Sequence, residues 1–374
     1  MDYVLNLKIW NKPQGLSMDS FRQRRTLGSC LIFTFLLLQA LNAILFTYFC
    51  EFGMTNTTSP RPELEPEPQP LRDPEASNLT ILLWSWPFRG RFPIGNCSQL
   101  LGIPDCRITA NRKWYPKADA VVVHHYDVSR SPWSLPREPR PPSQVWIWFN
   151  LESPTHSRNV HYMDNRFNLT MSYRRDSDIF TPYGWLEVLP EPRHVTIPPK
   201  SKLVAWAVSN WNPSSRRVQY YRQLKKYLHV DIYGFQRLPL PRTEQVSILS
   251  QYKFYLAFES SVHEDYITEK LWKTALLAET VPVVCGPPRE NYERYLPPGS
   301  FIHIDDFPTA QQLALFLQEL DWNTERYKSY FQWRSRLAPV KNTSWSLHLC
   351  KACRALQTNP VRYQTVPALS KWFE

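Results

Sequence analysis

Phe254-Tyr-Leu-Ala-Phe-Glu259, followed closely by Asp265-Tyr-Ile-Thr-Glu-Lys270, carries the strongest structural signal in this chain. The first part is a continuous apolar run that ends in an acid, which predicts a buried strand, and the second predicts the start of a helix. Unpaired N–H groups at a helix start, together with the cation of Lys270, favour an anion such as phosphate. An ordinary strand and helix with charges facing water would show the same pattern, so the rest of the chain has to separate the two interpretations.

Strand-like and helix-like segments alternate along the chain. Continuous apolar runs lie at residues 81–84, 120–123, 145–149, 203–208, 254–258, 281–285 and 301–304. Helical patterns lie at residues 214–228, 268–279, 309–320, 324–336 and 344–357. Apolar runs of this kind are typical of parallel sheets covered on both faces. The proline-rich segment 190–199 separates two α/β halves, and such folds bind ligands at the carboxyl ends of their strands.

The N-terminal region predicts a membrane anchor. Residues 31–50 are almost entirely apolar, and about 20 such residues cross a bilayer as a helix. The basic residues before this run are Lys8, Lys12, Arg22, Arg24 and Arg25. They favour a cytosolic tail at residues 1–30 and a lumenal position for the bulk of the chain. A cleaved signal peptide is the alternative, but no small-residue cleavage site is evident. The proline-rich residues 51–77 predict an extended stem.

The seven cysteines agree with an oxidising compartment. Cys30 and Cys50 flank the predicted anchor, and Cys285 lies in an apolar run. The other four are Cys97, Cys106, Cys350 and Cys353, which allow three pairings and predict two structural disulfides. A redox pair or half a zinc site is the alternative for the Cys-x-x-Cys spacing. A link from the early pair to the late pair would tie the last long helix to the first half.

Glycosylation sequons and net charge also bear on the partners. The five Asn-x-Ser/Thr sequons, all after the predicted anchor, are at Asn56, Asn78, Asn96, Asn168 and Asn342. They are predicted N-glycosylation sites of a lumenal protein. The net charge of +11 is spread over the chain, so a solvated surface with one local anionic ligand accounts for it, and we expect no nucleic-acid partner.

Two acidic motifs have chemical potential. Glu152 follows the apolar run 145–149, and a desolvated carboxylate at a strand exit has a raised pKa and can act as a general base. A loop acid bonded to nearby backbone is the alternative. Asp176-x-Asp178 could hold a divalent cation with a diphosphate. Because Arg174 and Arg175 precede the pair, internal ion pairs are the favoured interpretation.

A series of longer segments resembles the animal α1,3-fucosyltransferases of the Lewis type over about residues 81–373. The segments are Ile81-Leu-Leu-Trp-Ser-Trp-Pro-Phe88, Ala118-Asp-Ala-Val-Val-Val-His-His125, Leu151-Glu-Ser-Pro-Thr-His156, Phe167-Asn-Leu-Thr-Met-Ser-Tyr-Arg-Arg-Asp-Ser-Asp178, Val208-Ser-Asn-Trp211, Asp265-Tyr-Ile-Thr-Glu-Lys270 and Cys350-Lys-Ala-Cys353. So many matches in the same order are specific to the family.

The resemblance implies a GT-B fold, in which two Rossmann-like domains face each other. These would be an acceptor-side domain at residues 78–195 and a GDP-fucose-binding domain at 196–357, with a tail at 358–374 that packs back on the first. It also implies inverting transfer of L-fucose from GDP-β-L-fucose to O3 of N-acetylglucosamine in N-acetyllactosamine-type glycans of glycoproteins and glycolipids. The anchor and the resemblance together imply a single-pass type II protein of the Golgi membrane.

The resemblance also implies roles for individual residues. Glu152 matches the catalytic base of the family. Donor-binding positions match Arg217, Lys270, Tyr266, Glu269, Asn210 and Glu259, and acceptor-side positions match His125, Tyr126 and Asp127. We expect no tightly bound cofactor and no metal held by protein ligands, while stimulation by Mn²⁺ and assembly into a homodimer stay open. Two alternatives stay open as well: an α1,3/4-fucosyltransferase that also acts on type 1 chains, and a catalytically silent relative that only binds glycans.

Overall fold

The computed structural model describes residues 79–234, 236–341, 344–358 and 364–374. The predicted tail, anchor and stem therefore lie outside the described residues. Within the described ranges, no helix combines the length and the apolar character that crossing a bilayer requires. Residues 74–374 form one compact unit, which holds all of the elements below.

The first half is built on a parallel sheet with the strand order β2-β1-β3-β4-β5-β6. Its strands are β1 (Leu79–Leu83), β2 (Cys106–Thr109), β3 (Ala120–His124), β4 (Val145–Asn150), β5 (Leu169–Ser172) and β6 (Ile179–Phe180). β1, β3 and β4 are buried along their whole length, which is why they appear in the sequence as unbroken apolar runs.

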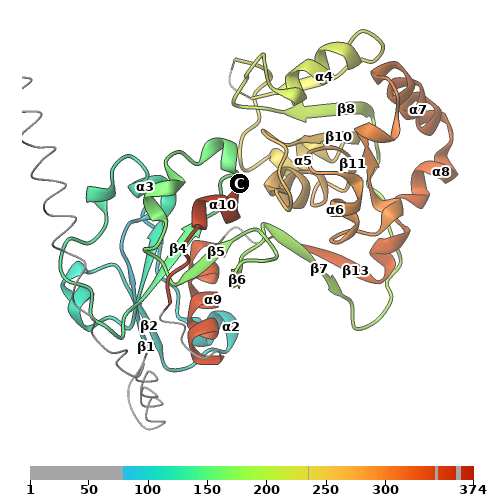
Figure 1. Ribbon diagram of the computed structural model, residues 1–374. Coiled ribbons are helices and arrows are strands. Elements are labelled where there is room, and N and C mark those ends of the chain that lie inside the picture. The colour runs from blue at the N-terminus through green and yellow to red at the C-terminus, as the bar shows by residue number, and fades with distance from the viewer. Residues whose placement is uncertain (1–78, 235, 342–343, 359–363) are drawn as a thin grey trace, which may run out of the picture. The chain divides into compact units, whose positions relative to one another are not determined.

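The second half repeats this winding in a parallel sheet of order β12-β11-β10-β8-β9 (Figure 1). Its strands are β8 (Lys202–Ala207), β9 (Asp231–Tyr233), β10 (Tyr252–Phe258), β11 (Val281–Cys285) and β12 (Ile302–His303). In each sheet the second strand lies on one side of the first and the later strands on the other. This reversal places ligand sites at the carboxyl ends of the two strands that flank it, here β8 and β10.

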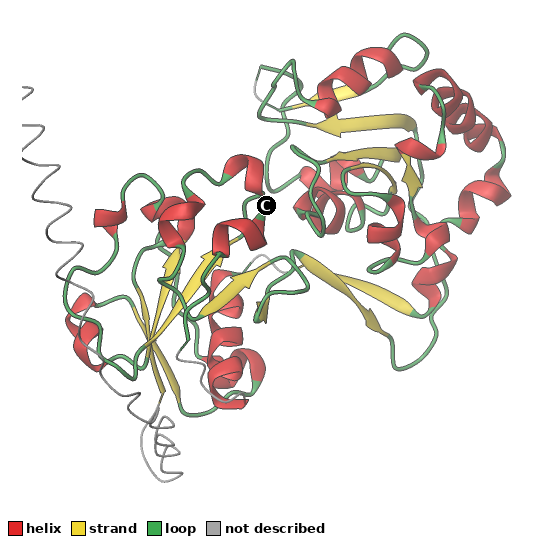
Figure 2. Cartoon of the chain, in the orientation of Figure 1, coloured by secondary structure: helices red, strands yellow, loops and turns green. Residues whose placement is uncertain are grey.

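Helices connect and cover the strands, and β7 (Gly184–Val188) pairs with β13 (Leu337–Lys341) as an antiparallel ribbon apart from both sheets (Figure 2). The α-helices are α2 (Cys97–Leu101), α3 (His125–Val128), α4 (Arg216–Leu224), α5 (Gln245–Leu249), α6 (Arg289–Glu293), α7 (Ala310–Trp322), α8 (Thr324–Ser329), α9 (Trp345–Thr358) and α10 (Leu369–Phe373). The shorter helical turns are η1 (Pro87–Arg89), η2 (Arg112–Lys117), η3 (Pro132–Ser134), η4 (Pro154–His156), η5 (Val160–Met163), η6 (Lys270–Ala275), η7 (Pro298–Ser300), η8 (Ile304–Asp306) and η9 (Gln332–Ser335).

The predicted strands are all present, whereas six strands of the described residues are not predicted. The missed strands β2, β5, β6, β7, β9 and β13 are short or contain polar residues, so they lack a continuous apolar run. Among the helices, α7 follows its pattern closely because the Thr309 hydroxyl caps it and Leu313 and Leu317 bury one face. The predicted helix 324–336 is divided into α8 and η9.

The predicted helix 268–279 is shorter and wider than expected. It is the π-type turn η6, in which the Leu276 N–H donates to the carbonyl of Leu271, five residues earlier. Glu279 then adopts a left-handed φ of 52°, which ends the helical path. Wide turns of this kind often occur at functional sites.

The last long helix corrects the predicted division of the chain. We expected residues 196–357 to form the second half, but Leu349 and Leu356 of α9 pack in the hydrophobic core of the first sheet. Figure 1 shows α9 and α10, in red, beside the strands of that sheet. The tail behaves as predicted, because Leu369 and Phe373 of α10 are buried in the same core.

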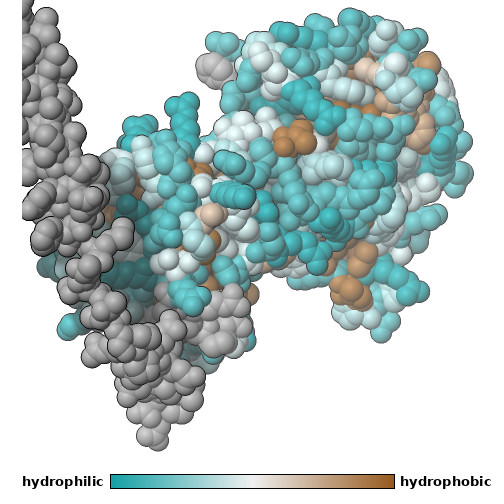
Figure 3. All heavy atoms as spheres, viewed as in Figure 1, coloured by the Kyte–Doolittle hydropathy of each residue, from teal (hydrophilic) through white to brown (hydrophobic). Residues whose placement is uncertain are grey.

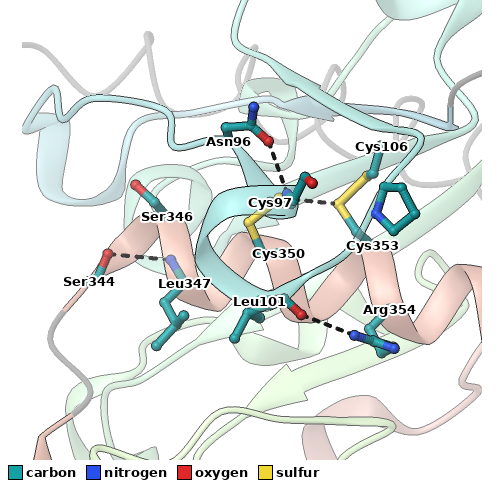
Figure 4. The surroundings of a disulfide bond; sticks show 12 residues. Asn96, Cys97, Leu101, Cys106, Ser344, Ser346, Leu347, Cys350, Cys353 and Arg354 are labelled. Atoms are coloured by element: carbon teal, nitrogen blue, oxygen red, sulfur yellow. Dashed lines mark hydrogen bonds between the residues drawn. A yellow bond between two sulfur atoms is a disulfide. The ribbon is translucent and has the colours of Figure 1, made fainter.

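Two disulfides fix this return of the chain and confirm the predicted number of bonds. Cys97 of α2 is bonded to Cys350, and Cys106 of β2 is bonded to Cys353 (Figure 4). One turn of α9 thus carries both late cysteines toward the first sheet. Cys285 is free and buried in β11, so this cysteine is a packing residue of the apolar strand.

Candidate active site

A cavity of about 500 Å³ lies at the carboxyl ends of strands from both sheets. The lining residues that carry a charge, an amide or a polar ring are Glu152, His156, Tyr183, Asn210, Arg217, Arg242, Gln245, Tyr255, Tyr266, Glu269, Lys270 and Lys273. Elsewhere, the face seen in Figure 3 is mostly hydrophilic, with apolar side chains in small separate patches. Six of the predicted site residues therefore meet in one place, although they come from segments far apart in the sequence.

Glu152 stands at the first-half wall of the cavity, two residues beyond β4. Its backbone N–H donates to Asn150 Oδ1 at 3.2 Å, and the Tyr183 hydroxyl donates to the carbonyl of Leu151 at 2.5 Å. The strand exit is thus held from two sides. Burial raises the pKa of the Glu152 carboxyl, and the charge of Lys270 lowers it only in part. A carboxylate with a raised pKa that faces a cavity can accept a proton from a bound hydroxyl.

Lys270 supplies a cation on the opposite wall. Its Nζ donates to Oε2 of Glu259 at 3.0 Å and to Oγ1 of Thr268 at 2.7 Å. Burial favours the neutral amine, but the carboxylates of Glu259 and Glu269 raise the pKa of Lys270, so it is protonated. Burial raises the pKa of Glu259, and the charge of Lys270 with the hydrogen bonds from Thr268 and Lys270 opposes that shift only in part.

Arg217 is the second cation of this wall. It lies in the first turn of α4, is 5% exposed, and donates from Nη2 to the carbonyl of Asn210 at 2.5 Å. Its Nε is buried and has no hydrogen-bond partner among the described residues. The neighbouring Arg216 instead pairs with Asp305 at the surface. A buried guanidinium with an unused donor is suited to an anionic ligand.

Tyr266 and Glu269 complete the predicted donor-side group. Tyr266 is 3% exposed, and its ring packs edge-on against Tyr173 at 5.2 Å. Asp265, just before it, has a left-handed φ of 59° and accepts hydrogen bonds from Asn291 and Tyr295. These hydrogen bonds stabilise Asp265 in a backbone conformation that is otherwise unfavourable. Burial raises the pKa of Glu269, but the charge of Lys270 together with hydrogen bonds to the Glu269 carboxylate outweighs burial and leaves that pKa lowered.

Two of the predicted site residues have other positions than expected. Glu259, predicted to bind the donor, lies beneath Lys270 and does not line the cavity. His125, predicted on the acceptor side, is 1% exposed, and both of its ring nitrogens are used inside the protein. Nε2 is bonded to the carbonyl of Arg158, and Nδ1 accepts from Trp148. Burial lowers the pKa of His125 to about 4, so it is a neutral core residue.

The neighbouring acceptor-side candidates lie in α3, which directly follows β3. Tyr126 is 48% exposed and its ring contacts Phe88 at 4.8 Å. Asp127 accepts from the backbone N–H of Phe88 and bonds to His124 Nδ1 at 2.6 Å. Tyr126 therefore presents an open aromatic ring, whereas Asp127 mainly fixes the loop around it.

The acidic pair Asp176 and Asp178 has internal partners, as the flanking arginines indicated. Arg174 donates twice to Asp176, and Asp178 accepts from the backbone and hydroxyl of Thr170. Within the described ranges, no group of three or more His, Cys, Asp or Glu side chains is arranged to hold a metal ion.

The predicted glycosylation sites differ in accessibility. Asn96 is exposed and caps α2, whereas Asn168 is 4% exposed, and its Nδ2 donates to the carbonyl of Gln364. Asn56, Asn78 and Asn342 lie outside the described residues. A glycan at Asn168 would have to be attached before that side chain is buried.

Several cavity residues were not predicted. His156 ends Leu151-Glu-Ser-Pro-Thr-His156, one of the segments that carry the family resemblance. Its spacing of four residues from Glu152 was a usable signal, because both follow the same strand. No such signal marked Arg242, Gln245 and Lys273. Arg242 lies in the loop before α5, Gln245 is the first residue of α5, and Lys273 lies within η6.

Comparisons with known proteins agree with this architecture. Residues 76–184 match the family described as "Fucosyltransferase, N-terminal", and residues 197–372 match "Glycosyltransferase family 10 (fucosyltransferase) C-term". The 4-galactosyl-N-acetylglucosaminide 3-alpha-L-fucosyltransferase FUT6 of Pongo pygmaeus is 52% identical over 91% of this chain and 95% of that protein. The 3-galactosyl-N-acetylglucosaminide 4-alpha-L-fucosyltransferase FUT3 of Homo sapiens is 50% identical over 96% of this chain and 99% of that protein. A crystal structure of an alpha1,3-fucosyltransferase shares the fold, with a TM-score of 0.51 at 18% identity over 79% of this chain and 95% of that chain. This chain therefore belongs to glycosyltransferase family 10, the fucosyltransferases.

Proposed function

We propose that the protein transfers L-fucose from GDP-β-L-fucose to O3 of N-acetylglucosamine in N-acetyllactosamine-type glycans, with inversion at the anomeric carbon. The observation that carries this proposal is the placement of Glu152, Arg217 and Lys270 on the walls of one cavity. A base and two cations are what a single displacement at a sugar diphosphate needs.

The reaction follows from the charges on the two walls. Glu152 accepts the proton of the acceptor O3 hydroxyl while that oxygen attacks C1 of fucose. The bond from C1 to the phosphate oxygen breaks, and its electron pair stays on the β-phosphate of GDP. Lys270 and Arg217 stabilise the negative charge that grows there. GDP is a good leaving group, so this step needs no protein acid.

The finer points of fold and location are part of the same proposal. We propose a GT-B arrangement with the nucleotide held mainly by the second half, because all five predicted cavity residues other than Glu152, and the reversal at β8 and β10, belong to that half. We also propose a type II protein of the Golgi membrane with its active site in the lumen. The two disulfides support an oxidising compartment.

A second linkage is an explicit candidate. The printed names of the relatives include both 3-alpha-L- and 4-alpha-L-fucosyltransferases, so transfer to O4 on type 1 chains is the alternative product. Tyr126 offers an exposed aromatic face without a charge, which both acceptor types could use. Linkage analysis of products from type 1, type 2 and sialylated acceptors separates these outcomes.

The test of the mechanism is the variant Glu152→Gln in the purified full-length protein. Gln keeps the size of the side chain but cannot accept the proton, so turnover should fall by about 10²–10⁴-fold. GDP binding, measured by calorimetry, should stay close to that of the wild type. A variant with wild-type turnover would remove Glu152 as the base.

A further inference from the structure

His156 is a cavity residue to which neither the sequence nor the proposed mechanism gives a role. It ends the turn η4, four residues after Glu152, and its ring is exposed to the cavity. Partial burial lowers the pKa of His156, and the charges of Arg217 and Lys270 lower it further. The imidazole is therefore neutral in the neutral pH range, so one ring nitrogen is a donor and the other an acceptor.

A chain of two hydroxyl groups decides which nitrogen carries the proton. The Ser261 hydroxyl donates to Ser153 Oγ at 2.7 Å, and Ser153 Oγ lies 2.9 Å from His156 Nδ1. Ser153 has one hydroxyl proton, and its oxygen already accepts from Ser261. In the described part of the chain, Nδ1 is the only acceptor bonded to this buried hydroxyl, so donation to Nδ1 is what satisfies the Ser153 proton, and Nδ1 is the acceptor. The ring proton of His156 is then on Nε2.

The turn that carries this ring is fixed before any ligand binds. Ser153 is 0% exposed, and its carbonyl accepts from the Ser157 hydroxyl at 2.9 Å. Thr155 Oγ1 lies 2.7 Å from Nε2 of His263, which comes from the loop after β10. The loops of the two sheets are thus joined at Ser153 and at Thr155. Because the turn is already held, binding of a ligand costs little conformational entropy at His156.

The Nε2–H group has no hydrogen-bond partner in the part of the chain that the structure describes. The cavity that it faces contains Arg217, whose buried Nε is also unused, and Lys270. Both cations are close enough to influence the titration of His156. Three side chains that can donate hydrogen bonds thus line one cavity, and only two of them are charged.

We propose that His156 is a further ligand of the sugar nucleotide, which donates from Nε2–H to a diphosphate oxygen beside Arg217 and Lys270. This inference rests on the proposed function and deepens it. A neutral donor adds a directed hydrogen bond without placing a third positive charge next to two cations. The bond strengthens as negative charge collects on the phosphate when the C1–oxygen bond breaks, so it contributes to turnover as well as to binding.

The experiment compares His156→Ala, His156→Gln and the control His161→Ala in the purified full-length protein. His161 is an exposed histidine of η5 that does not line the cavity. His156→Ala should weaken GDP binding and lower kcat/KM for GDP-fucose by about tenfold to a hundredfold, the usual effect of losing a hydrogen bond to a charged group. Gln carries an amide N–H near the position of Nε2 and should recover most of this loss. His161→Ala should match the wild type.

Ser153→Ala tests the hydroxyl chain separately from folding. It should weaken GDP binding in the wild-type background but have no further effect in the His156→Ala background, because Ser153 acts through His156. Nitrogen-15 NMR of histidine-labelled protein should show an unprotonated Nδ1 at His156. Wild-type GDP affinity in His156→Ala, or equal losses in the Ala and Gln variants that follow a fall in Tm, would overturn the inference. Glu152→Gln, run in parallel, tests the base alone, so the two ideas fail by different measurements.

Discussion

Lys270 donates from Nζ to Oε2 of Glu259 at 3.0 Å, so a carboxylate with 1% of its side chain exposed lies directly beneath a cation of the cavity. Breaking a buried pair by removing one charge usually costs about 3–5 kcal/mol. Glu259→Gln should therefore lower the free energy of unfolding by about that amount and leave Lys270 less well placed for the donor. Chemical denaturation, together with KM for GDP-fucose, measures both effects.

The control for this variant is Glu269→Gln. Glu269 contacts the same Lys270 at 3.4 Å, but its side chain is 46% exposed. Exposed pairs contribute at most about 1 kcal/mol, so its unfolding free energy should change little. Equal destabilisation of the two variants would contradict a special role for the buried acid.

Adjacent arginines offer a matched pair for the donor site. Arg217→Ala removes a buried guanidinium from the cavity and should raise KM for GDP-fucose by about 10–100-fold. Arg216→Ala removes a side chain that is 43% exposed and pairs with Asp305 at the surface. It should stay within about twofold of the wild type, since exposed pairs contribute little. Steady-state kinetics with varied GDP-fucose concentration measure KM for both variants. A larger increase in KM for Arg216→Ala than for Arg217→Ala would assign the donor-site role to Arg216 instead.

The pH profile should report Glu152. Transfer needs its carboxylate ionised, so kcat at saturating donor should rise with pH through its pKa. Burial raises that pKa above the ordinary value of 4.5, Lys270 opposes the shift, and the charge of Glu269 adds to it. In Glu269→Gln the acid limb should therefore move to lower pH. An unchanged limb, or one that moves to higher pH, would show that another group controls it.

The disulfides should contribute strongly to stability. Each closes a loop of about 250 residues, as the sequence separations of 253 and 247 show, and removing such a bond usually costs 2–5 kcal/mol. Cys97→Ala with Cys350→Ala should therefore lower Tm clearly, whereas reduction of the remaining bond should lower it further. Peptide mapping without reductant should recover Cys97 with Cys350. A Cys97–Cys106 peptide would contradict the pairing.

Gly234 tests the floor of the cavity. Its φ is 130°, and a Cβ there would lie 2.2 Å from the carbonyl oxygen of Val208. Gly234→Ala should displace the loop after β8 and weaken GDP binding, with a fall in Tm. Gly299→Ala is the control, because a Cβ at Gly299 meets nothing within 4 Å. Similar GDP affinity for the two variants would show that this loop is not part of the donor site.

The prediction of strands succeeded where the sequence is a continuous apolar run and failed where the strand is short or contains polar residues. β10 and β11 are buried along nearly all of their length, so their sequences are uniformly apolar. β9 has three residues, Asp231 to Tyr233, and is held by one neighbour at the edge of the sheet. Whether such a short edge strand forms depends on the strand beside it, so the residues of the segment alone do not predict it.

The candidate site was predicted in its chemistry but not in its arrangement. Glu152 and Lys270 were identified by their position after or near strands, and both reach the cavity. Glu259 and His125 looked equally suitable, yet one lies beneath the cavity and the other lies in the core. The conformation of the loop that follows a strand determines which side chain near the strand end reaches the ligand.

The amino-acid sequence by itself determined the two α/β halves, the number of disulfides and the family, because local hydrophobic pattern and motif order are properties of contiguous residues. Only the tertiary structure decided that α9 returns to the first sheet, that Cys97 pairs with Cys350, and that Ser261 orients His156 through Ser153. The return of α9, the disulfide and the contact of Ser261 with Ser153 all join residues more than a hundred positions apart. They arise from packing of whole elements, which no local pattern encodes.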